Sequence, residues 1–88
     1  MTLKINRHAS GGHVIVQLVG TMRAEHLDEV KAQVTMTDDH VTIDVGELTL
    51  VSVEGIRFLN ACQDEGADIV NASPYIFEWM TLERNTIQ

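Results

Sequence analysis

The spacing of apolar side chains changes along the central stretch of the chain, residues 41–59. A strand over residues 40–46 is predicted because β-branched residues alternate with polar ones there. From residue 53 onward apolar residues recur every three positions, the spacing of one helix face: Ile56, Leu59 and Cys62. The pattern therefore predicts a strand, a loop and a helix that starts near Ser52.

Two further strands are predicted before this stretch. Residues 2–8 alternate between apolar and polar, which is typical of an edge strand with one buried face. Residues 13–20 carry apolar side chains on both sides of the chain, which predicts a strand buried on both faces. The sequence Ser10-Gly11-Gly12 between them favours a tight turn, so we expect an antiparallel hairpin.

Alternating helices and strands complete the chain. Apolar residues at helical spacing predict a helix over residues 24–34, with Thr21 or a neighbour as its N-cap. The helix that starts near Ser52 should end near Glu65, before Gly66. A short strand within residues 67–72 and a helix opened by Ser73-Pro74 follow.

We therefore predict one α/β domain over residues 1–88. Its element order is β-β-α-β-α-β-α. Strand–helix–strand connections of this length imply parallel pairing, so the sheet is small and mixed, with helices packed mainly on one face.

Composition narrows the class of partner. The net charge is −7, which argues against binding to nucleic acid or to an anionic membrane surface. No apolar run approaches the roughly 20 residues that span a bilayer, so direct membrane insertion is not expected. The single cysteine and the lack of a signal-peptide pattern at residues 1–8 favour a cytoplasmic protein.

The order of the elements and several motifs resemble the STAS family, which includes bacterial anti-sigma factor antagonists and the tails of sulfate transporters. The motifs are Val16-Gln17-Leu18-Val19-Gly20, Val41-Thr42-Ile43-Asp44-Val45, Ser52-Val53-Glu54-Gly55-Ile56, Gly66 with the strand after it, and Ser73-Pro74-Tyr75-Ile76. The resemblance extends from Leu3 to Arg84, although the family's fifth strand is missing. It implies a STAS-like fold and a non-catalytic, signalling module that binds a protein such as an anti-sigma factor of the switch-kinase type.

One motif departs from the family pattern Asp-Ser-Ser-Gly-Leu, in which a partner kinase phosphorylates the first serine. Here Ser52 stands where the family has Asp, Val53 replaces the first serine, and Glu54 replaces the second. The resemblance therefore implies a binding surface without the usual switch at Val53. Ser52 is open to phosphorylation only if the register differs by one residue. The partner-binding residues expected from the resemblance are Ser52, Val53, Glu54, Gly55, Arg57 and Phe58.

Three acidic or hydroxyl side chains have two interpretations each. Glu54 could imitate a phosphate at the helix start, but an ordinary first-turn acid that the helix dipole favours is the better interpretation. Ser52 is better interpreted as an N-cap than as a modification site. Asp44 belongs either to an acidic patch at the strand end or to a solvent-facing position within the strand.

Metal, redox and catalytic functions have little support. The chain has four histidines, His8, His13, His26 and His40, and their spacing fits no named metal motif. We therefore expect neither a metal nor another cofactor. Cys62 sits at a core-like helix position, which favours an inert buried thiol. The common nucleophile, phosphate-binding and zinc-protease motifs are absent, so we do not expect an enzyme.

An alternative function keeps the same fold. One or two of the four large side chains Tyr75, Phe77, Trp79 and Met80 should be exposed and could form a contact patch. The chain would then be an accessory subunit of a transport or lipid-trafficking complex that docks through this helix. The sequence leaves open whether the protein forms a homodimer.

Overall fold

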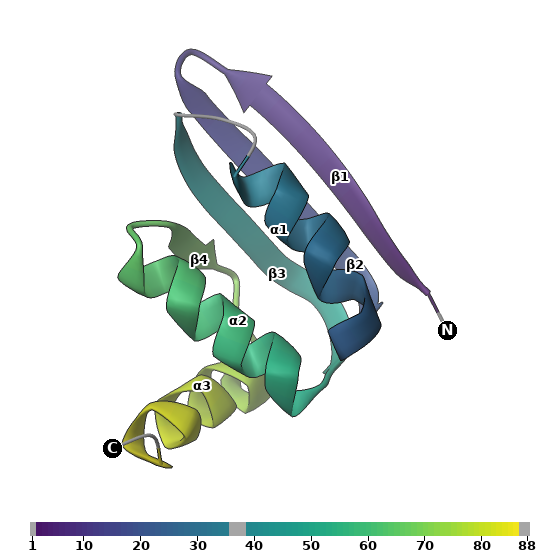
Figure 1. Ribbon diagram of the computed structural model, residues 1–88, viewed down its shortest axis with the longest axis vertical. Coiled ribbons are helices and arrows are strands. Elements are labelled where there is room, and N and C mark those ends of the chain that lie inside the picture. Colours follow the sequence, from purple (N-terminus) through teal and green to yellow (C-terminus); the bar gives the residue numbers. More distant parts are fainter. Residues whose placement is uncertain (1, 36–38, 87–88) are drawn as a thin grey trace.

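The computed structural model describes residues 2–35 and 39–86 of the chain, and its elements follow the predicted order (Figure 1). The strands are β1 (Leu3–Ser10), β2 (His13–Met22), β3 (His40–Val51) and β4 (Asp68–Val70). The helices are α1 (Leu27–Thr35), which follows a 3-10 turn over Ala24–His26, α2 (Val53–Asp64) and α3 (Pro74–Thr86). The strand order is β1-β2-β3-β4, with β1 antiparallel to β2 and the other pairs parallel. The predicted mixed sheet is therefore confirmed.

The described helices lie to one side of the sheet. Helices α1 and α2 lie over the same face, and α3 lies beside α2 at the β4 end (Figure 1). The buried side chains between sheet and helices are mainly aliphatic: Val14, Val16, Leu18, Val30, Ile43, Val45, Ile56, Leu59 and Ile76. The opposite sheet face is open, so the expectation that residues 13–20 would be buried on both faces is wrong. Ile15 of β2 points to that face and is 39% exposed, because no described helix covers it.

Glycine and serine residues define the ends of several elements as predicted. Gly11 and Gly12 have φ values of +56° and +79°, which suits the tight type I′ turn of a hairpin. The Ser52 and Ser73 hydroxyl oxygens accept hydrogen bonds from the backbone N–H groups of Gly55 (3.2 Å) and Ile76 (3.3 Å), so both serines are N-caps. Gly66, with φ +104°, follows the C-cap residue Glu65 of α2.

The start of the first helix differs from the prediction. Thr21 is a buried residue of β2, and the strand continues through Met22. The N-cap is Arg23, whose backbone N–H donates to Nδ1 of His26 at 3.1 Å. Thr21 does not cap the helix because it belongs to β2 and its side chain is buried, at 2% exposure.

Strand β3 is longer than predicted, and the loop expected after residue 46 is not formed. Residues Glu47, Leu48, Leu50 and Val51 continue to pair with β2, after register shifts at two positions along that strand. Such bulges let the ladder resume past an irregular residue. Here the Asp44 carboxylate accepts a hydrogen bond from the Gly46 N–H at 2.9 Å, which stabilises the backbone at this irregularity. Asp44 is half-buried, and Ser52 alone joins β3 to α2.

Gly20→Ala should destabilise the fold more than Gly66→Ala, by about 1–3 kcal/mol in the free energy of unfolding. Both glycines have nearly the same backbone, with φ values of +101° and +104°, so the strain of a positive φ is shared. A Cβ at Gly20 would lie 2.6 Å from the Thr2 carbonyl oxygen, whereas nothing lies within 4 Å of a Cβ at Gly66. Urea unfolding of the two variants measures the difference, and equal losses of stability would contradict it.

Candidate protein-interaction site

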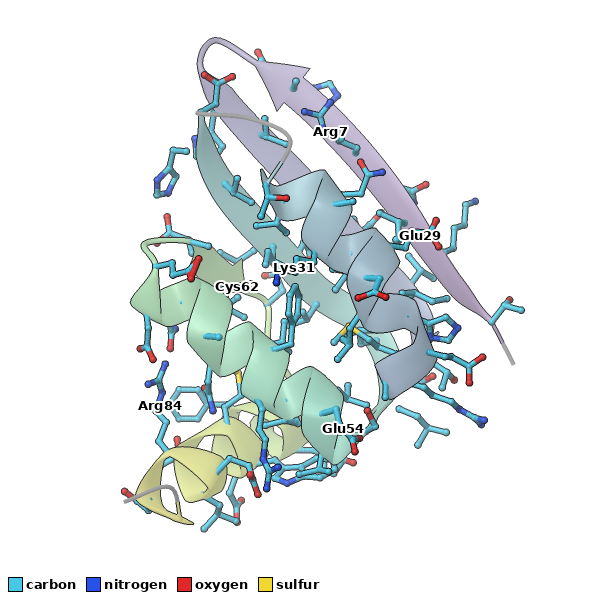
Figure 2. All side chains as sticks on the ribbon, viewed as in Figure 1. Arg7, Glu29, Lys31, Glu54, Cys62 and Arg84 are labelled. Carbon is cyan, nitrogen blue, oxygen red and sulfur yellow. The ribbon has the colours of Figure 1, made fainter. Side chains whose placement is uncertain are left out.

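The start of α2 is fixed directly to the end of β2. The Ser52 N–H donates to the Met22 carbonyl at 2.9 Å, and the Ser52 carbonyl accepts the first hydrogen bond of the helix from Ile56 at 3.0 Å. With its hydroxyl capping Gly55 N–H, Ser52 has its backbone and side chain engaged. Val53 is half-buried, and Glu54 is exposed in the first turn of the helix (Figure 2).

A shallow groove of about 390 Å³ lies beside this helix start. One wall is the turn between β2 and α1, which contributes Arg23 and Glu25. The other is the corner between β3 and α2, which contributes Leu50, Ser52 and Glu54. Leu50 is 52% exposed, so the groove combines an accessible apolar side chain with charges of both signs.

The groove brings together residues that are far apart in the sequence. The pairing of Thr21 with Leu50 and of Met22 with Val51 places the two chain turns side by side. Ser52 and Glu54 were expected at this site from the sequence, whereas Arg23, Glu25 and Leu50 were not. No local pattern marks those three residues, and only the register between β2 and β3 identifies them as neighbours.

Comparison with known proteins identifies the architecture. The sequence matches no protein-family model, and no curated protein matches it. Among solved structures, the chain is similar to the anti-sigma factor antagonist SpoIIAA in its unphosphorylated form, with a TM-score of 0.72. The similarity covers 98% of this chain and 94% of SpoIIAA, at 11% sequence identity. The chain has the STAS fold. The predicted fold is thereby confirmed, and at this identity the likeness establishes the fold alone.

Three other residues expected to bind a partner occupy different places in this STAS fold. Gly55 is buried, and a Cβ there would lie 2.7 Å from Val51 Cγ1, so glycine allows α2 to approach the sheet closely. Arg57 Nε donates to Glu83 Oε1 of α3 at 2.9 Å, away from the groove lining. Phe58 is half-buried and lines a cavity between α1 and α2. Of the residues expected to bind a partner, the structure thus places Ser52 and Glu54 in the groove lining, but not Val53, Gly55, Arg57 or Phe58.

Polar contacts hold α3 of the STAS fold against α2. The Arg84 guanidinium donates to the Asp64 carboxylate (2.9 Å), Gln63 Oε1 (2.8 Å) and the Asn60 carbonyl (3.2 Å) near the end of α2 (Figure 2). Asn60 Nδ2 donates to the Met80 carbonyl at 3.0 Å. These contacts leave one side of α3 directed to solvent.

The aromatic side chains of α3 are divided between core and surface, as expected. Met80 is buried and Trp79 is half-buried. Tyr75 and Phe77 are 52% and 66% exposed, and the Tyr75 ring lies 5.7 Å from that of Trp79, measured between centroids.

Among the described helices, none has the length and apolar character needed to span a membrane.

Cys62 is a buried thiol, as predicted. It is 7% exposed, and burial, together with the negative charge of Glu65, raises its pKa from 9.0 to about 11, while Lys31 acts in the opposite direction. A thiol with this pKa is almost entirely protonated at neutral pH, so it is a poor nucleophile.

His8 and His13, on the two strands of the hairpin, do not pair with each other. His8 pairs with Ile15 across the hairpin, whereas His13 pairs with Ser10 on β1 and with His40 on β3. The His13 and His40 rings lie 5.1 Å apart between centroids, in an edge-to-face arrangement. His26 accepts the hydrogen bond that starts the first helix.

Proposed function

We propose that this protein is a non-catalytic, cytoplasmic interaction module that regulates a protein partner through the groove at the start of α2. The observation that carries the proposal is the combination of an exposed acid, Glu54, and an exposed apolar residue, Leu50, on the two sides of a capped helix start. The fold shared with the antagonist SpoIIAA supports a protein partner of the anti-sigma factor type.

The chemistry of the groove supports a binding role over catalysis. Among the described residues that line it there is no histidine or cysteine, and its Ser52 hydroxyl is engaged as the helix cap. A nucleophile needs a base within hydrogen-bond reach, and among the described residues no hydrogen bond joins the Ser52 hydroxyl to the carboxylate of Glu25 or Glu54. The groove can instead hold an apolar side chain against Leu50 and a cation near Glu25 or Glu54.

We further propose that the module works without a phosphorylation switch at the helix start. Val53 has no hydroxyl, and the Ser52 hydroxyl accepts the cap hydrogen bond from Gly55. Glu54 supplies a constant negative charge there, which the helix dipole favours by about 0.3–1 kcal/mol. Binding would then be governed by the amounts of the two proteins.

Glu54→Lys should reduce partner capture at least tenfold, because it reverses a charge in the lining of the proposed surface. The tagged protein is used to capture its partner from native lysate, and the captured protein is identified and quantified by mass spectrometry. Glu78→Lys is the matched control, since Glu78 is an exposed acid on α3 and undergoes the same charge change. Arg57→Glu is unsuitable, because it would break the ion pair with Glu83 that links α2 to α3.

The outcome separates this function from the alternative. Unchanged capture by a folded Glu54→Lys protein would reject the groove as the partner site. The exposed rings of Tyr75 and Phe77 favour a second candidate, an accessory subunit of a transport or lipid-trafficking complex that docks through α3. In that case the double variant Tyr75→Ala, Phe77→Ala should abolish partner capture, whereas Glu54→Lys should leave it unchanged. The captured protein should then be a transport ATPase.

A further inference from the structure

Two histidines and one aspartate lie side by side on the open face of the sheet. His13 of β2 and His40 of β3 are Cα partners in the parallel ladder. Asp68 of β4 is the Cα partner of Thr42, which is two residues beyond His40 and so directs its side chain to the same face. Three neighbouring strands therefore each supply one side chain of a type that ligates metal ions.

The distances within the cluster are short. Nε2 of His40 lies 2.8 Å from Oδ2 of Asp68, and Nε2 of His13 lies 2.6 Å from the Thr42 hydroxyl. Since Thr42 and Asp68 are adjacent across β3 and β4, both Nε2 atoms are directed toward the same row of the sheet. The His13 and His40 ring centroids are 5.1 Å apart.

These separations are close to those of a tetrahedral zinc site. Zinc–nitrogen bonds of about 2.0–2.1 Å at the tetrahedral angle place two imidazole centroids about 5 Å apart and neighbouring ligand atoms about 3.3 Å apart. The two rings already have this spacing, and the His40–Asp68 pair needs to open by about 0.5 Å. As they stand, no three side chains of a ligating type in residues 2–35 and 39–86 are arranged to hold a metal ion, so binding requires His13 Nε2 to turn away from Thr42, to which it bonds.

We propose that His13, His40 and Asp68 bind one divalent transition-metal ion, with zinc as the expected ion. Two imidazoles and a carboxylate suit zinc, nickel or copper better than magnesium or calcium. The His40 and Asp68 side chains are 47% and 63% exposed, so the ion can enter from solvent and retain a water ligand. The net charge of −7 attracts cations to the protein. A bound ion would cross-link β2, β3 and β4 on the face opposite the helices.

The test titrates the metal-free full-length protein with zinc chloride near neutral pH, by calorimetry and by thermal unfolding. We expect one ion per chain and a rise in Tm of about 5–10 °C at a free zinc concentration ten times the dissociation constant. His13→Gln and His40→Gln should each weaken zinc binding at least tenfold, and Asp68→Asn should weaken it as well. The control His8→Gln with His26→Gln removes two histidines outside the cluster and should bind zinc like the wild type.

Three results would overturn the proposal. The first is no zinc binding by the wild type at about 1 mM metal. The second is a loss of affinity in the His8→Gln, His26→Gln control equal to that of the cluster variants. The third is loss of binding in Cys62→Ser, which would place the ion in the cavity on the helix side that Cys62 and His40 both line. Circular dichroism of each variant verifies that an altered affinity is not the result of unfolding.

Discussion

Replacing Ile56 with alanine should lower the free energy of unfolding by about 3–4 kcal/mol. Ile56 is fully buried and lies in the first turns of α2, where it packs into the single core between helices and sheet. The substitution removes three buried carbon atoms and leaves a cavity that the rigid β3–α2 corner cannot close. Because small domains have only about 5–15 kcal/mol of stability, this loss is a large share of the total.

Phe77→Ala is the control for this experiment. It removes a larger apolar group from a helix, but Phe77 is 66% exposed and should cost less than about 1 kcal/mol. Urea unfolding followed by circular dichroism gives both values. If the two variants lose similar stability, burial beneath α2 is not the source of the effect.

The second large effect is a loss of stability between pH 9 and pH 11 that depends on Cys62. The pKa of this thiol is 9.0 in the unfolded chain and about 11 in the folded protein, so the folded state holds its proton more tightly. Stability from this group is therefore complete below pH 9 and is lost as the pH rises through 11. A difference of two pKa units corresponds to about 2–3 kcal/mol of folding stability, which is present in full only below pH 9.

The measurement compares wild type with Cys62→Ala by urea unfolding at several pH values across this range. The variant is less stable at neutral pH because it leaves a small cavity, but its stability should decline less with pH. The other side chains are the same in both proteins, so their contribution cancels in the difference. Parallel pH curves would show that the thiol does not ionise differently in the folded and unfolded chains.

Local sequence patterns were sufficient for the type and order of the elements. The structure contains a strand where residues 41–45 alternate and a helix where apolar residues recur every three positions from Ile56. It also contains a helix, α3, that begins at the Ser–Pro sequence. The length of β3 was not predictable in this way. Its extension to Val51 depends on bulges that restore pairing with β2, and those are set by the neighbouring strand.

The candidate site was only partly predictable for the same reason. The resemblance to STAS domains indicated Ser52–Gly55, and the structure places Ser52 and Glu54 in the groove lining. Helical spacing alone could not show that Arg57 contacts Glu83 or that Phe58 faces α1. The neighbourhood of His13, His40 and Asp68 could not be predicted either, since these residues come together only through parallel strand pairing.

The one-residue connection at Ser52 has a consequence for the speed and energetics of association. The backbone between β3 and α2 is held by three contacts: the Ser52 N-cap, the pairing of β2 with β3, and the hydrogen bond from the Ser52 N–H to the Met22 carbonyl. A partner that docks on the groove therefore meets a surface whose backbone does not have to rearrange. Little backbone entropy is then lost on complex formation, and no slow rearrangement has to precede it. The encounter should follow simple second-order kinetics, in which the observed rate rises linearly with partner concentration.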